Sequence, residues 1–316
     1  MEFVTIRSII LTGAAALSLS AVPAMAQDEA GGFARPAAGA DLFYSTDSDD
    51  TEVVRAAAEF DLRNRGDNDR IGVRYERAWY SPQGQDTVSD DRVFLQVGKE
   101  LGDWQVRARV GTDMHTVIGA ISANDQAKFR KEVFLERDIV PTPLGLDDTP
   151  IYSTFGGAAI DLPLDDRNVV NLLAGYQTFT GDNERVHLRG TYIHVVKPEW
   201  GLSAQLRTRY FHSSAPREFD YYSPEYYLQV LPVVQVRRWF GEGWMVQAAG
   251  GVGVQKDDFS DWRQSNYGQL RVESPRGDYD WSVNGEITYT NQPSDNAVAG
   301  TGYDYFQTLL GVTRRF

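Results

Sequence analysis

The fold is indicated most clearly by the stretch Leu202-Ser203-Ala204-Gln205-Leu206-Arg207-Thr208-Arg209-Tyr210. Apolar or weakly polar side chains alternate there with strongly polar ones at every second position. Successive side chains of a β-strand point to opposite faces of the sheet. The stretch therefore predicts a strand with one apolar face and one polar face.

The same alternation recurs along most of the chain. Clusters of Gly, Asn, Asp and Pro separate the alternating runs, as hairpin turns require. Their number predicts about 14 to 16 strands of a length that can cross a bilayer. The alternation is weak between residues 116 and 163, and no stretch has a helical pattern. The clearest further runs are 71–76, 104–112, 228–230, 234–237, 246–248 and 281–289.

A soluble β-sandwich and a membrane β-barrel both produce this alternation. Three features favour the barrel: the runs are long, aromatic residues gather at their ends as interfacial girdles do, and the last run ends on the aromatic Phe316. We predict an all-β, transmembrane, antiparallel up-and-down barrel over residues 41–316. The aromatic residues in question are Trp79-Tyr80, Trp104, Trp200, Tyr210-Phe211, Trp239-Phe240, Trp244, Trp281 and Tyr289.

The first 26 residues have the features of a secretory signal peptide. Arg7 supplies the positive start, residues 9–22 form a short apolar run, and Ala24-Met25-Ala26 fits the small-x-small cleavage rule. Residues 27–40 are rich in Gly, Ala and Pro and are expected to form a flexible lead-in to the barrel. Export of such a barrel predicts a location in the bacterial outer membrane.

The composition excludes several classes of function. The chain has no cysteine, so disulfides, thiol nucleophiles and thiolate metal sites are excluded. Its net charge of −13 argues against a nucleic-acid partner. We expect no cofactor and no metal site. The acidic residues are expected to lie mainly in loops, such as Asp47-Ser48-Asp49-Asp50 and Asp257-Asp258.

If the polar face lines the interior, its side chains are the candidate contacts for a solute. Two interpretations remain open: Arg and Glu ladders that pair across strands and fill the interior, or a lining for an anionic or hydroxyl-rich solute. The candidates on the strands are Arg107, Arg109, Arg189, Arg207, Arg209, Gln229, Gln235, Arg237, Arg271 and Glu286.

No sequence pattern points to an enzyme. The possible catalytic groups are His115, His187, His194 and His212 with Ser213-Ser214, and no acid is placed against any of them by sequence. A nucleophile elbow and a His-Glu-x-x-His motif are both absent from the sequence. We therefore predict that the protein is not an enzyme.

Residues 218–227, Glu-Phe-Asp-Tyr-Tyr-Ser-Pro-Glu-Tyr-Tyr, form an aromatic pair and Ser-Pro before a strand. From here to Phe316 the chain resembles the C-terminal barrel of exopolysaccharide-secretion porins, the export proteins for cellulose and poly-N-acetylglucosamine. The resemblance implies passage of a polysaccharide through a barrel of roughly 16 strands without ATP, and it adds Tyr221 and Tyr222 to the candidate contacts. The family carries a tetratricopeptide superhelix before the barrel, whereas these 316 residues contain none.

The sequence therefore predicts an outer-membrane channel for polysaccharide or a related saccharide, most specifically an exopolysaccharide export porin. The expected partners are outer-membrane lipid and lipopolysaccharide, the saccharide itself, and a separate periplasmic protein that guides the polymer. Two alternatives stay open: a diffusion porin for small solutes, and a closed structural or lipid-modifying barrel.

Overall fold

The computed structural model describes residues 35–275, 279–293 and 303–316. The predicted signal peptide, with its cleavage site, lies outside the described residues. The described part contains sixteen strands and one short 3-10 turn, η1. The bounds are β1 Arg35–Asp47, β2 Glu52–Asn64, β3 Arg70–Ser81, β4 Val88–Leu101, β5 Trp104–Thr112, β6 Val117–Asp125, β7 Lys131–Ile139, β8 Tyr152–Pro163, β9 Asn168–Phe179, β10 Glu184–Lys197, η1 Pro198–Trp200, β11 Leu202–Ser213, β12 Tyr226–Phe240, β13 Trp244–Asp257, β14 Arg263–Glu273, β15 Trp281–Thr290 and β16 Tyr305–Arg315.

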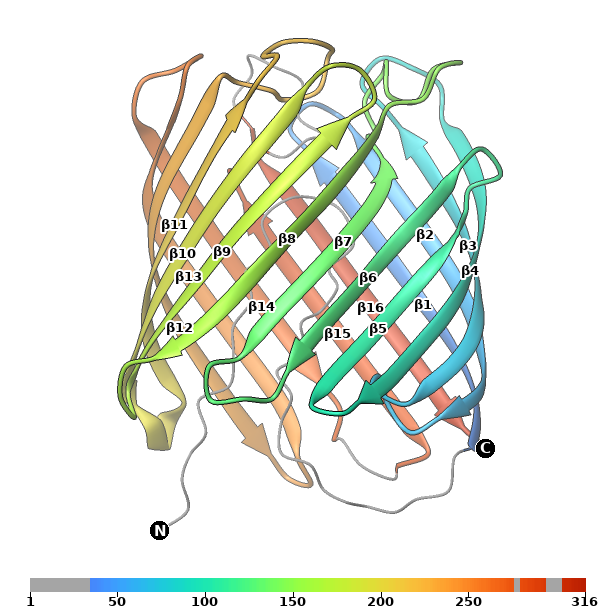
Figure 1. Ribbon diagram of the computed structural model, residues 1–316, viewed down its shortest axis with the longest axis vertical. Coiled ribbons are helices and arrows are strands. Elements are labelled where there is room, and N and C mark those ends of the chain that lie inside the picture. Colours follow the sequence, from blue (N-terminus) through green and yellow to red (C-terminus); the bar gives the residue numbers. More distant parts are fainter. Residues whose placement is uncertain (1–34, 276–278, 294–302) are drawn as a thin grey trace.

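The strands form one closed antiparallel barrel in which each strand pairs with its neighbours in sequence (Figure 1). The barrel closes between β1 and β16, whose register runs from Ala37 opposite Arg315 to Asp47 opposite Tyr305. Closure leaves no free sheet edge, which is the condition for a sheet to stand in hydrocarbon. The predicted all-β, up-and-down barrel is confirmed, at the upper end of the expected strand number.

The barrel begins earlier in the chain than the sequence indicated. β1 starts at Arg35, so residues 35–40, which were assigned to the flexible lead-in, belong to the first strand. The alternation is hidden there because the inward side chains are small. At Gly39 an added Cβ would lie 2.7 Å from Glu59 Oε1, so this inward position leaves room for the neighbouring strand's carboxylate.

The region of weak alternation, residues 116–163, contains β6, β7 and β8. Small residues again hide the pattern there, and one of them makes room for an aromatic ring. A Cβ at Gly157 would lie 2.8 Å from the Phe134 ring and 2.8 Å from the Ala174 carbonyl oxygen. The glycines and other small residues of β6 to β8 therefore reflect close packing within the sheet and not a break in it.

The two faces of the strands differ as the alternation predicted. On β4 the outward Leu95 is 65% exposed, whereas the inward Arg92 is 1% exposed. Leu188, Leu206 and Leu310 on other strands are likewise exposed on the outer face. This band of outward apolar side chains around a polar interior is the reverse of a soluble sandwich and suits a lipid environment.

Exposed tryptophans gather at the end of the barrel where β16 ends, which is drawn at the bottom of Figure 1. Two of the aromatic residues assigned to the girdles do not belong there. Tyr80 and Phe211 are 0% and 1% exposed and face the interior. Both continue the inward register of their strands, so Phe211 follows Arg209 at the next inward position. The exposed tryptophans at this end are Trp200, Trp239, Trp244 and Trp281.

The two ends of the barrel also differ in their connections. Tight turns join the strands at the end where the chain terminates, while longer loops at residues 140–151 and 214–225 lie at the opposite end. In outer-membrane barrels the short turns are periplasmic and the long loops extracellular. We call these the periplasmic and outer ends. None of the described helical segments is long and apolar enough to cross a membrane.

We predict that Leu95→Arg lowers the free energy of unfolding by about 2–4 kcal/mol, because it places a charge on the lipid face near the middle of β4. Urea titration of the barrel in lipid vesicles measures this. The control is Leu101→Arg at the periplasmic end of the same strand, which is expected to cost about 0–1 kcal/mol. If the two substitutions lowered the free energy of unfolding equally, the midplane of the bilayer would not lie near the middle of β4.

Candidate functional site: the interior face of the barrel

The strand residues predicted to face the interior do so. They lie on the same inward register as the buried polar residues of their strands, and five of the ten are less than 10% exposed. The structure places Arg107 and Arg109 on β5, Arg189 on β10, Arg207 and Arg209 on β11, Gln229, Gln235 and Arg237 on β12, Arg271 on β14 and Glu286 on β15. Whether these side chains touch a solute stays a prediction.

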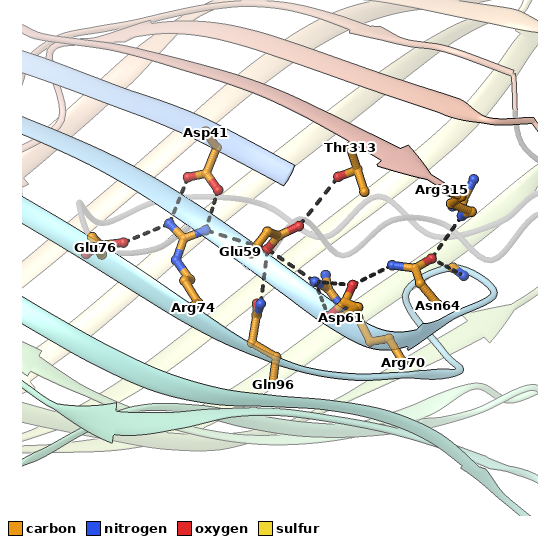
Figure 2. A network of polar contacts seen from close by, with 11 residues as sticks. Asp41, Glu59, Asp61, Asn64, Arg70, Arg74, Glu76, Gln96, Thr313 and Arg315 are labelled. Carbon is orange, nitrogen blue, oxygen red and sulfur yellow. Dashed lines mark hydrogen bonds and ion pairs between the residues drawn. The ribbon is translucent and has the colours of Figure 1, made fainter. Parts of the chain in front are cut away.

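An ion-pair network lines the interior next to the seam between β16 and β1 (Figure 2). Its centre is Arg74 on β3, whose guanidinium donates to both carboxylate oxygens of Asp41 on β1 and, at 2.8 Å, to Glu76. Arg70 lies 2.8 Å from Asp61 and 3.1 Å from Glu59, both on β2. Two arginines thus hold four carboxylates from three strands.

The last strand is tied into the same network. The Thr313 hydroxyl donates to Glu59 over 3.4 Å, and the Arg315 Nε donates to the Asn64 side-chain oxygen over 2.9 Å. Both donors belong to β16, whereas both acceptors belong to β2. Side chains therefore reach across β1 and reinforce the closure that the backbone ladder makes.

The network continues toward the outer end and shows that acidic residues are not confined to loops. Arg92 lies 3.1 Å from Asp138 and 3.5 Å from Glu76, and Arg55 lies 3.3 Å from the same Asp138. Our expectation for the acids was therefore wrong for this half of the barrel. Nearby carboxylates stabilise these buried guanidinium groups, since an isolated buried charge is expensive.

The wall formed by β9 to β12 has the opposite character. Five arginines face inward there, and the single acidic residue in these four strands is Glu184, which is exposed at the first position of β10. The register places Arg189 directly opposite Arg209, with Thr191 opposite Arg207. Like charges in directly opposed positions weaken a sheet. The five arginines are Arg185, Arg189, Arg207, Arg209 and Arg237.

Aromatic rings support these guanidinium groups. The Arg207 guanidinium lies 4.7 Å from the centre of the Tyr267 ring, which belongs to β14, three strands away. Arg189 lies over Phe155 at 5.7 Å, and Arg209 lies 5.6 Å from the Tyr227 ring. Cation–π contacts of this kind favour a cation in a site with little water. Sequence spacing could not reveal them, because the partners are on different strands.

A ladder of amide side chains crosses the same side of the interior. The Gln205 amide donates to Gln235 over 3.3 Å, which links β11 to β12. Farther along, Arg237 donates to Gln247 at 2.8 Å, Gln247 to Gln269 at 3.1 Å, and Gln269 to Glu286 at 3.1 Å. Amide groups both donate and accept, as hydroxyl-rich solutes do. We call these residues the amide ladder.

Tyr221 and Tyr222 lie in the outer loop 214–225 and not on the strands. Tyr221 stacks on Phe179 with ring centres 4.4 Å apart, and the Tyr222 hydroxyl donates to Asp257. Both side chains are almost fully buried. Burial and the hydrogen bond to Asp257 raise the pKa of Tyr222, so its hydroxyl remains protonated. A contact with a polymer stays a prediction for both residues.

The same loop connects three of the outer hairpins. Asp220 accepts hydrogen bonds from the Thr142 hydroxyl and the Leu144 backbone N–H, both at 2.8 Å, in the loop 140–151. Glu218 accepts from the backbone N–H of Asn183 at 3.1 Å. Arg217 pairs with Asp258 at 2.8 Å. The loop 214–225 thus organises the outer end of the barrel.

Two of the candidate histidines, His187 and His194, have amide side chains as hydrogen-bond partners. His187 is hydrogen-bonded to the Gln177 side chain at 2.9 Å and packs between Phe155 and Phe211. His194 contacts Asn168 at 2.9 Å. In the part of the chain that the structure describes, no group of three or more His, Asp or Glu residues could hold a metal ion.

No family model matches the chain, and no curated protein matches it in sequence. Among solved structures it is similar to a bacterial polysaccharide outer membrane secretin, with a TM-score of 0.65 and 13% identity over 88% of this chain and 98% of that one. OmpT of Vibrio cholerae aligns over 90% of this chain and 97% of its own, at 10% identity and a TM-score of 0.43. OprB of Pseudomonas putida aligns over 90% and 92%, at 11% identity and a TM-score of 0.36.

These similarities concern shape alone. The first of them shows that the chain has the fold of a bacterial outer-membrane β-barrel, which agrees with the predicted location. The expectation that the protein is not an enzyme stays a prediction.

We predict that Arg74→Met lowers the free energy of unfolding by about 3–5 kcal/mol, because it leaves buried carboxylates without their counter-charge. Urea unfolding in vesicles measures the loss. The matched control is Arg77→Met on the same strand, whose ion pair with Asp91 is exposed and 3.8 Å long. That control is expected to cost about 0–1 kcal/mol. A cost for Arg74→Met no larger than for Arg77→Met would refute a structural role of the network.

Proposed function

We propose that the protein is an outer-membrane channel through which a polysaccharide, or a related saccharide, passes without an energy source in that membrane. The observation that carries the proposal is the inner wall of β9 to β15, where arginines on aromatic rings lie beside a ladder of amides. Saccharides present hydroxyl groups that both donate and accept hydrogen bonds, and amide and guanidinium groups complement them.

The shape comparison supports the same proposal. The similar solved structure is a polysaccharide secretin, and 98% of its chain aligns with this barrel. The aromatic and Ser-Pro tract at residues 221–224 stands immediately before β12, as the resemblance to exopolysaccharide porins implies. The finer assignment, export of an exopolysaccharide with a periplasmic partner that delivers the polymer, is part of the proposal.

The interior is polar in two different ways, and the proposal uses only one of them. In the network of Arg74 and Arg70 each guanidinium is paired with carboxylates, and the network serves the seam. The amide ladder runs over five strands, from β11 to β15, and its one carboxylate is Glu286 on β15. A passing chain of sugars can exchange its hydrogen bonds with such a ladder step by step, because each amide offers weak and replaceable contacts.

We predict that liposomes containing the barrel take up neutral oligosaccharides, and that the double variant Gln247→Leu/Gln269→Leu slows this uptake about fivefold, as loss of about 1 kcal/mol of hydrogen bonding at a barrier would. Liposome swelling measures the rate. The control Val246→Leu/Leu270→Ile changes neighbouring positions on the lipid face and should leave the rate unchanged.

A deletion strain tests the finer assignment. Loss of the gene should abolish surface polysaccharide while the polymer accumulates inside the cell envelope, and restoring the gene should reverse both effects. Normal polysaccharide secretion in the deletion strain, together with rapid uptake of small solutes by the liposomes, would make the protein a diffusion porin. Absence of any uptake would instead indicate a closed barrel.

A further inference from the structure

The two ends of the interior differ in how far their inward side chains are exposed. Near the outer end, the inward Tyr227 of β12 and Gln255 of β13 are both 0% exposed. Near the periplasmic end, the inward Arg237 of β12 is partly exposed and the inward Asn284 of β15 is exposed. The interior is therefore accessible at the periplasmic end and covered at the outer end by the residues that the structure describes.

Ion pairs connect distant parts of the wall just inside the outer end. Arg55 of β2 lies 3.3 Å from Asp138 of β7, which stands five strands farther along the sheet. Arg92 of β4 lies 3.1 Å from the same carboxylate. Neighbouring strands are about 4.8 Å apart, so a single ion pair between β2 and β7 has to cross the interior. This half of the barrel is thus bridged near its outer mouth.

Aromatic rings make a second connection in the other half. Phe211 of β11 and Tyr227 of β12 stack with ring centres 5.1 Å apart, and Tyr222 of the loop 214–225 packs edge-on against Phe211. These three rings belong to one buried cluster with Tyr305, at the start of β16. Three strands separate β12 from β16 in the sheet. The loop 214–225 therefore carries the cluster across the mouth toward the seam.

The loops 140–151 and 214–225 meet between these two connections. The carboxylate of Asp220 accepts two hydrogen bonds from the loop 140–151, both at 2.8 Å. Tyr221 adds an apolar contribution, because it belongs to the same buried cluster as Val140. We call the hydrogen bonds of Asp220 the loop junction. With this junction closed, the described residues connect the walls across the whole outer end.

The loop junction is less protected from water than the anchors of the two loops. Tyr222, which anchors the loop 214–225, is 4% exposed, whereas Asp220 is only partly buried and Leu144 is 47% exposed. Water can replace exposed hydrogen bonds at little cost, so local opening starts at such places. Arg217 also has a φ of 62°, a left-handed conformation that side chains disfavour. The described shape of the loop therefore depends on its contacts.

We infer that the loops 140–151 and 214–225 form a gate at the outer mouth, which is shut in the described conformation and opens at the loop junction. The inference rests on the proposed function only in needing a channel, and it holds whatever the solute is. A barrel left open would leak small solutes in both directions. Loops that part while a chain passes, and close behind it, prevent this leak.

Single-channel recording of the full barrel in planar bilayers, with potassium chloride as the electrolyte, tests the gate. We expect the unaltered barrel to be shut for most of the time, with brief openings. Asp220→Ala should raise the fraction of time spent open at least about fivefold, as the loss of one net hydrogen bond would. The matched control Asp148→Ala removes an exposed carboxylate from the loop 140–151 and should leave this fraction unchanged.

A chemical cross-link should reverse the effect. The chain has no cysteine, so Leu144→Cys/Asp220→Cys introduces a single pair of thiols, one on each side of the loop junction. Before treatment this variant should be open as often as Asp220→Ala, and a short bismaleimide should shut it. Leu144→Cys alone, treated with the same reagent, is modified without being bridged, and its open fraction should not fall. Urea unfolding in vesicles verifies that each variant is folded.

The outcomes separate the gate from the proposed function. Equal open fractions for the unaltered barrel and Asp220→Ala, or continued conduction after cross-linking, would overturn the gate and leave the channel in place. Absence of current through every variant would overturn both. A gate that responds as expected, in a barrel that lets no oligosaccharide into liposomes, would keep the gate and reject the saccharide channel.

Discussion

Closure of the sheet between β1 and β16 is the constraint on which the rest of the structure depends. Hydrocarbon offers no hydrogen-bond partners, so every backbone N–H and C=O in the membrane must be paired within the sheet. The β1–β16 ladder removes the last free edge. Once the sheet is closed, the strands turn mainly apolar side chains to the lipid, and most of their buried polar side chains are gathered in the interior.

The gathered charges are distributed unevenly around the interior. From β1 to β4, carboxylates and arginines pair with one another, and Thr313 and Arg315 bring β16 into the same network. From β9 to β12, arginines lie on aromatic rings and amides, with acid only at the exposed Glu184. The barrel thereby separates a wall that secures its closure from a wall that we propose contacts the solute.

The alternation of side chains predicted the strands and their two faces well, because that pattern is a local property. It failed where local signals are weak. Gly39 and its small neighbours hid the start of β1, and Tyr80 and Phe211 resembled girdle residues although their register points them inward. Tyr221 and Tyr222 were singled out by their motif, but their burial within the outer loop 214–225 depends on contacts with Phe179 and Asp257.

The sequence by itself determined that the chain forms a barrel, because period-two alternation and turn residues act between near neighbours. It also determined which residues face inward on most strands, including Arg207 and Arg209. Only the tertiary structure decided which inward charges meet. The pairing of Arg74 with Asp41, the opposition of Arg189 and Arg209, and the contact of Arg207 with a ring three strands away all depend on strand register and on barrel curvature. Both arise from closure of the whole sheet, which no local stretch of sequence encodes.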